Sequence, residues 1–138
     1  MTIAVRNPRT GANDYTIDPA SPADLAALAR RLRAAQPAWA ARTPDERGAI
    51  LRRWAEAIER HATTIAAALT DDTGRQTISR IEVAGVAQLV RRWADRAPAL
   101  IAGHARRDQP TSQPTITTTT ALIPYPLVGV ISPWNFPL

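Results

Sequence analysis

Apolar residues recur at every third or fourth position through roughly the first hundred residues, which is the spacing of one face of a helix. This period predicts four helices, over about residues 22–36, 44–60, 63–72 and 77–97. We expect the apolar stripe of each helix to face the core. In chain order the stripes are Leu25, Leu28, Leu32, Ala35 and Trp39; Ile50, Leu51, Trp54 and Ile58; Ile65 and Leu69; and Ile78, Ile81, Gly85, Leu89 and Trp93.

Cap residues mark the ends of these helices. Ser21 is a typical N-cap, because proline and an acidic residue follow it within the first turn. Thr43 and Glu46 have the spacing of a capping box, in which each side chain bonds the backbone amide of the other residue. Gly74 suits the residue that closes the third helix, since glycine adopts the left-handed conformation without strain.

Proline and turn residues predict where regular structure stops. Pro37 and Pro98 should each end or kink a helix, because proline lacks the amide hydrogen that the helix needs. Residues 1–20 hold several turn residues, and we expect them to be irregular. Residues 104–114 are polar with two prolines, so we interpret them as a linker.

Beyond the linker the pattern changes to that of strands. Residues 115–123 are β-branched almost throughout, which predicts a strand with an exposed or edge position for its threonine face. Residues 127–131 form a short apolar run, typical of a strand covered on both faces. One strand cannot make a parallel sheet, so this chain by itself predicts an incomplete fold.

Composition limits the class of protein. The chain has 138 residues, of which 45% are hydrophobic and 21% charged, as in a globular domain. Much of the apolar content is alanine, which predicts a thin core. The sequence has no cysteine, which excludes disulfides, cysteine zinc sites and a thiol nucleophile within it. We see no membrane span or signal peptide, and expect a cytoplasmic protein with no metal and no membrane partner.

The net charge is +5, and all 17 basic residues are arginines. A basic balance can indicate a nucleic-acid partner. Here the arginines are scattered on the polar faces of predicted helices, near acidic residues, and no aromatic residues alternate with them. We therefore favour a solvated helical surface and expect no nucleic-acid partner.

The most informative chemistry lies in the turn at residues 132–137. Pro133 and Pro137 restrict the backbone on both sides of Asn135. A carboxamide on a stiff support is a neutral donor that cannot titrate, as an oxyanion hole requires. The alternative is a structural turn asparagine that bonds nearby backbone, and the residues alone favour that alternative.

Residues 128–138 resemble the signature of the aldehyde dehydrogenase superfamily. Residues 7–11 resemble its opening Asn-Pro-x-Thr-Gly, and the stretch 34–51 resembles its first helical pair through Gln36, Trp39, Thr43, Arg47 and Leu51. Residues 72–75, followed by Glu82, resemble its Glu-x-Gly-Lys segment with aspartate and arginine substituted. The resemblance covers essentially the whole chain, and its terminal motif is the most specific part.

The resemblance implies an α/β fold with a Rossmann-type cofactor domain, a catalytic domain and an oligomerisation arm made of strands. Residues 1–105 would be the helical N-terminal part of the cofactor domain, and residues 106–126 the linker and arm strand. Residues 127–138 would be the first sheet strand and the catalytic turn. The implied activity is oxidation of a small-molecule aldehyde to a carboxylic acid with NAD or NADP, in a protein that forms homo-oligomers when full length.

The same matching implies roles for single residues. Asn135 would be the oxyanion-hole donor for the adduct formed when a cysteine thiolate attacks the aldehyde. The nicotinamide side of the cofactor site would be lined by Ile131, Ser132, Pro133 and Trp134. Glu82, like the other helical acids, is interpreted as a surface residue.

The family's cysteine nucleophile and general-base glutamate have no counterpart in these residues. We therefore expect the 138-residue chain to be inactive and unstable alone, and interpret it as the N-terminal piece of a longer dehydrogenase. One alternative is a non-catalytic interaction module that pairs through its arm with full-length subunits. Another is a free-standing arginine-rich helical protein that binds nucleic acid, which predicts binding with a steep salt dependence.

Overall fold

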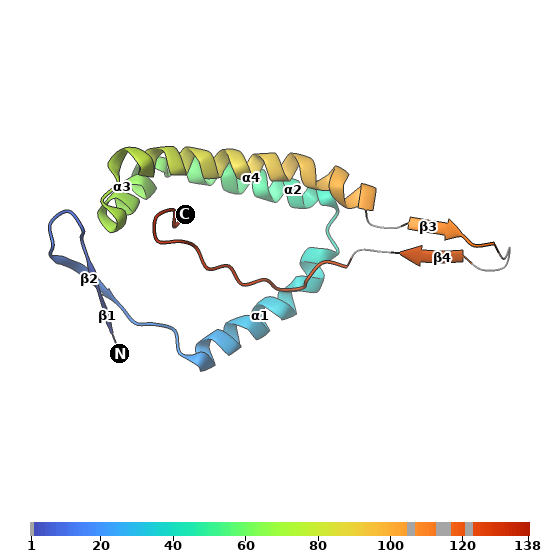
Figure 1. The fold of residues 1–138 in the computed structure, drawn as a ribbon, viewed down its shortest axis with the longest axis horizontal. Helices are drawn as coiled ribbons and strands as arrows, with labels where there is room; N and C mark the ends of the chain where they lie inside the picture. The colour runs from blue at the N-terminus through green and yellow to red at the C-terminus, as the bar shows by residue number, and fades with distance from the viewer. Residues whose placement is uncertain (1, 105–106, 113–116, 121–122) are drawn as a thin grey trace.

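The computed structural model describes residues 2–104, 107–112, 117–120 and 123–138. Most of the described chain is helical, in agreement with the sequence (Figure 1). The helices are α1 (Pro22–Ala40), α2 (Pro44–Arg60), α3 (Ala62–Thr73) and α4 (Gln76–His104). Helices α2, α3 and α4 pack together as one bundle, and α1 diverges from it.

The predicted helix caps are confirmed. In α1 the amide of Asp24 donates to Ser21 Oγ at 3.1 Å, and the Asp24 carboxylate accepts the Ser21 amide at 3.0 Å. The same reciprocal pair opens α2. The amide of Glu46 donates to Thr43 Oγ1 at 3.2 Å, and the Glu46 carboxylate accepts the Thr43 amide at 2.7 Å. Gly74 closes α3 with a φ of 70°. Each of these signals is local in sequence, so distant contacts do not alter it.

Pro37 and Pro98 do not end their helices. Helix α1 continues to Ala40, and α4 runs past its proline to His104. A proline ring removes one backbone hydrogen bond, but its fixed φ is itself helical. Neighbouring turns keep their bonds, as shown by the amide of Ala41, which donates to the carbonyl of Pro37 at 2.9 Å.

Small side chains build the core of the bundle. Its buried cluster consists of Ala55, Ile58, Ala66, Leu69, Val83 and Ala87. Two interhelical ion pairs flank this cluster, Arg52 with Asp95 at 2.6 Å and Arg91 with Glu59. The alanine content therefore allows helices to approach closely while burying little area, as the composition predicts.

The predicted apolar stripes are only partly buried. Ile58 and Leu69 are buried, but α1 buries no residue. On α4 the buried face passes through Ser79, Val83 and Ala87, whereas the predicted residues Ile81, Leu89 and Trp93 are exposed. The tryptophans that we expected in the core, Trp39, Trp54 and Trp93, are 40–54% exposed. Small residues allow helices to pack closely, so the larger apolar residues are left on the opposite side of α4.

Residues 3–17 form a hairpin, so the prediction of irregular structure is wrong for this stretch. Strands β1 (Ile3–Arg6) and β2 (Asn13–Ile17) pair antiparallel, with a bulge after Val5. The side chain of Asn7 orders the loop by accepting the amides of Arg9 and Thr10 at 2.8 and 3.3 Å. Turn residues thus occupy the loop alone, and two short strands flank it.

A second hairpin projects from the far end of α4 (Figure 1). Strands β3 (Arg107–Pro110) and β4 (Thr117–Thr120) pair antiparallel, from Arg107 opposite Thr120 to Pro110 opposite Thr117. The predicted strand is confirmed at 117–120; residues 115–116 and 121–122 lie outside the described part. The predicted linker is wrong at 107–110, because polar residues can pair along the backbone with a strand of threonines.

The terminal segment runs back from the second hairpin and ends beside the bundle (Figure 1). Residues 127–131 form no strand here, in contrast to the prediction. A strand needs a neighbour for its backbone hydrogen bonds, and the described residues place none alongside. Within the described residues, no helix has both the length and the apolar character that crossing a bilayer would require.

Candidate functional site

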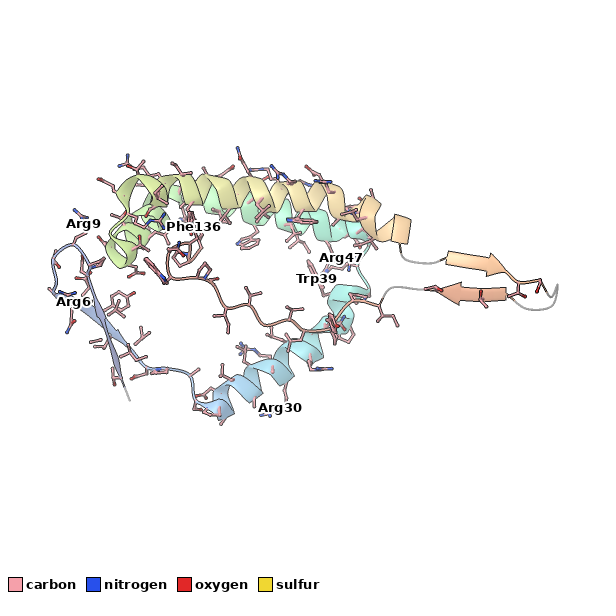
Figure 2. The ribbon with its side chains drawn as sticks, in the orientation of Figure 1. Arg6, Arg9, Arg30, Trp39, Arg47 and Phe136 are labelled. Atoms are coloured by element: carbon pink, nitrogen blue, oxygen red, sulfur yellow. The ribbon has the colours of Figure 1, made fainter. Side chains whose placement is uncertain are left out.

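The candidate site is the turn at residues 133–136, which carries the residues predicted to do chemistry. The amide of Phe136 donates to the carbonyl of Pro133 at 3.4 Å, so Trp134 and Asn135 are its central residues. Figure 2 shows Phe136 where the terminal segment curls back beside the bundle. The prolines restrict this backbone, as the sequence predicts.

Arg75 anchors one end of the turn from the connection between α3 and α4. Its guanidinium donates to the backbone carbonyl of Asn135. The same guanidinium lies over the ring of Phe136, 4.7 Å from the ring centroid. A planar, permanently charged group can make both contacts at once, which a compact ammonium cannot do as well.

The backbone of Arg75 is itself well fixed. Its amide donates to Thr73 Oγ1 at 3.3 Å, and its carbonyl accepts both the amide of Ser79 at 2.9 Å and Ser79 Oγ at 2.7 Å. Ser79 is fully buried in the first turn of α4. The guanidinium therefore extends from a rigid base.

Glu82 anchors the chain just after the turn. Its carboxylate accepts the amide of Leu138 at 2.9 Å, and the residue is only 8% exposed. The interpretation of Glu82 as a surface acid is therefore wrong. Seven positions separate Arg75 from Glu82, which is two helical turns, so both side chains reach the terminal segment from one side of α4.

The carboxamide of Asn135 is not used in the turn's hydrogen bonds. Arg75 donates to its backbone carbonyl, but its side chain has no hydrogen-bond partner among the described residues. Asn7 differs, because its Oδ1 accepts two loop amides and its Nδ2 donates to Asp14 at 2.9 Å. Asn7 is thus the structural turn asparagine, whereas Asn135 does not have that pattern.

The four residues predicted to line the cofactor site directly precede Asn135 in the chain, and Trp134 is within the turn. Ile131 is 99% exposed and Trp134 is 82% exposed, and Ser132 and Pro133 are exposed as well. Asn135 is half-buried against the bundle. The structure thus keeps the five residues together on one segment, with the apolar ones accessible.

The first hairpin packs against the α3–α4 connection. Tyr15 Oη donates to Asp72 Oδ1 at 2.8 Å, and this bond raises the pKa of the Tyr15 hydroxyl. A Cβ added at Gly74 would lie 3.2 Å from Pro8 Cγ. The connection that carries Arg75 therefore contacts the hairpin as well as the terminal turn.

A concavity of about 730 Å³ between α3 and α4 is separate from this site. Thr63, Thr70, Arg80 and Gln88 are among its lining residues, and none of the residues 131–135 lines it. Arg80 lies about 200° around the helix from Glu82, given 3.6 residues per turn. The concavity thus opens on a different face of α4 from the terminal turn.

Sequence reasoning missed Arg75 and Glu82 as site residues. Arg75 ends the segment that resembles Glu-x-Gly-Lys, and Glu82 follows seven residues later, a spacing of about two helical turns that was a usable signal. Their partners are 56 and 60 residues away, however, and no local rule connects them.

Comparison with known proteins finds relatives over the whole length of the chain. The model of the aldehyde dehydrogenase family matches residues 1–138. A solved structure of an aldehyde dehydrogenase, PutA from Anabaena variabilis, is 43% identical with a TM-score of 0.90, over 100% of this chain and 29% of that one. An NAD-dependent benzaldehyde dehydrogenase from Corynebacterium glutamicum is 26% identical with a TM-score of 0.74, over 83% and 24% of the two chains.

A curated relative gives a similar result. The chain is 31% identical over 130 residues to a Mycolicibacterium smegmatis protein named as a succinate-semialdehyde dehydrogenase that uses NADP+. The match covers 94% of this chain and 25% of the relative. The chain thus spans about a quarter of the length of the relatives it matches, and the predicted N-terminal part of this α/β fold is confirmed.

Proposed function

Because this chain belongs to the aldehyde dehydrogenase family, we propose that it carries the oxyanion-binding turn of an NAD- or NADP-dependent enzyme that oxidises an aldehyde to a carboxylic acid. The anchored turn at Asn135 supports this proposal most directly. Arg75 holds the turn at Asn135 and Phe136, and Glu82 holds the chain just after it at Leu138, while the carboxamide of Asn135 takes no part in these bonds. A fixed donor of this kind stabilises charge without having to reorganise.

The proposed role of Asn135 follows from the charge that develops during the reaction. A cysteine thiolate, from a part of the protein outside these residues, forms a bond to the aldehyde carbon, and the π pair of the carbonyl moves to its oxygen. Asn135 Nδ2 donates to that oxygen. A carboxamide does not titrate, so the donor stays available at every pH at which the thiolate exists.

In the following step, the electron pair on the oxygen returns to the bond with carbon. The C–H bond breaks with loss of hydride, the oxygen pair re-forms the C=O bond, and the product is a thioester. Nicotinamide, when bound, supplies the hydride acceptor. Water, losing a proton to a general base outside these residues, then attacks the thioester and releases the carboxylic acid and the thiolate. Asn135 can hold the same oxygen throughout.

The residues before Asn135 fit a nicotinamide group. Ile131 and Trp134 present exposed apolar side chains directly before Asn135. A flat, largely apolar ring suits such a surface. We propose that Ile131, Ser132, Pro133 and Trp134 line that side of the cofactor site. No residue here distinguishes NAD from NADP.

The second hairpin supports a proposal on assembly. Strands β3 and β4 make a sheet of two strands that projects from the bundle (Figure 1). A two-stranded sheet is marginal alone and has edges that can pair with further strands. We propose that this arm pairs with another subunit in a homo-oligomer. Cytoplasmic location stays a prediction.

The test uses the protein expressed from its complete gene, assayed for aldehyde-dependent formation of reduced cofactor. Asn135→Ala should lower kcat by about 10²–10³-fold, the usual effect of losing one oxyanion-hole donor. Asn13→Ala, an exposed asparagine of β2, is the matched control and should leave kcat unchanged. Full activity of Asn135→Ala would contradict the proposal.

A further inference from the structure

We propose that Arg75 and Glu82 are positioning residues for the reaction, because they fix the backbone that carries the Asn135 carboxamide. This inference rests on the proposed function. Neither side chain need contact the substrate, since both act on the turn. Among the described residues, the hydrogen bonds that join residues 127–138 to the helices are those of Arg75 and Glu82.

Arg75 restrains the backbone unit next to the reacting group. Its bond to the Asn135 carbonyl and its contact with the Phe136 ring lie on either side of one peptide bond. A planar peptide held at both sides cannot turn about its Cα–C bond without losing one contact. The Asn135 Cα, which bears the carboxamide, is part of that unit.

Glu82 restrains the chain two residues beyond the same turn. Its bond to the Leu138 amide lies just after Pro137, whose ring restricts the backbone in between. Because Arg75 immediately precedes α4 and Glu82 lies two turns later, a single rigid helix sets the distance between the anchors. The position of the turn is therefore fixed relative to α4.

Rigid placement matters for a donor that acts on a transient charge. A displacement of about 1 Å can lower a rate by about 100-fold. The terminal turn is at the surface and its neighbours are highly exposed, so local packing supplies little of the needed rigidity. The two anchors supply it instead.

The experiment measures kcat and KM in the protein expressed from its complete gene. Arg75→Met should lower kcat by about 10–100-fold and change KM for the aldehyde by less than about threefold. Arg75→Lys keeps a donor for the carbonyl but loses the planar contact with the Phe136 ring, so it should recover only part of kcat. Glu82→Gln keeps an acceptor but loses the charge, and should lower kcat by about threefold. Arg80→Met, an exposed arginine of the same helix, is the control and should match wild type.

A double variant separates positioning from general damage. If Arg75 acts through Asn135, adding Arg75→Met to Asn135→Ala should lower kcat by no more than about twofold further. Independent effects would multiply, and that result would overturn the inference. Should Arg75→Met fail to fold, Arg75→Lys and Glu82→Gln at full activity would overturn it as well.

The inference and the proposed function fail in different ways. Loss of activity in Asn135→Ala with wild-type kcat in Arg75→Met and Glu82→Gln would overturn the inference alone. Full activity in Asn135→Ala would overturn the proposed function, and the inference with it.

Discussion

Gly48 of α2 lies against the backbone carbonyl of Ala94 in α4. A Cβ built on Gly48 would be 2.9 Å from that oxygen, closer than such atoms approach in proteins. The contact brings together two helices whose facing residues are mostly small. It defines how closely α2 can approach the helix that carries Glu82.

Gly48→Ala should therefore destabilise the protein, although alanine favours helix formation by about 1 kcal/mol over glycine. The backbone oxygen cannot move aside as a side chain could, and overpacking costs about 1–3 kcal/mol. We expect a net loss of about 1 kcal/mol in the free energy of unfolding. Gly85→Ala is the matched control in α4, because a Cβ at that position would meet no atom within 4 Å. It should raise stability, and thermal denaturation would show whether the two changes have opposite signs.

Gly74→Ala should strain the α3–α4 connection. Its φ of 70° costs about 1–2 kcal/mol for a residue with a Cβ, and that atom would lie 3.2 Å from Pro8 Cγ. Gly74→Asn tolerates this conformation better and should lose about half as much. Equal melting temperatures for wild type and Gly74→Ala would contradict the account of this connection.

The capping box of α2 predicts a dependence on acid pH. The Thr43 backbone amide, followed by its hydroxyl, holds the pKa of Glu46 below the ordinary value of 4.5. Because the pKa of Glu46 is lower in the folded protein than in the unfolded chain, this carboxylate contributes to stability in full at a pH above its pKa in the unfolded chain. The contribution is lost as the pH falls through its pKa in the folded protein. Glu46→Gln should flatten this part of the curve of melting temperature against pH. A curve of melting temperature against pH that is unchanged in Glu46→Gln would contradict this account of the cap.

The features that the sequence predicted well are those with local causes. The Ser21 and Thr43 caps and the Gly74 terminator each depend on residues within a few positions. The buried face of α4 was predicted poorly, because apolar periodicity does not say which neighbour will pack there. Ile81 and Trp93 continue a regular stripe, yet the small residues Val83 and Ala87 face the bundle.

The site shows the same division. Asn135 and its prolines stand out in the sequence because the turn and the family motif are both contiguous. The partners of the turn, Arg75 and Glu82, come from the α3–α4 connection and from α4. Their contacts follow from the way the terminal segment folds back, which no pattern within the segment reveals.

The central claim is that the Asn135 carboxamide stabilises the oxyanion before hydride leaves. The most direct measurement is the single-turnover rate of reduced-cofactor formation by Asn135→Ala, in the protein expressed from its complete gene and with saturating aldehyde. The account predicts a rate lower by about 10²–10³-fold than wild type, with the binding of the cofactor unchanged. A single-turnover rate equal to that of wild type would contradict it.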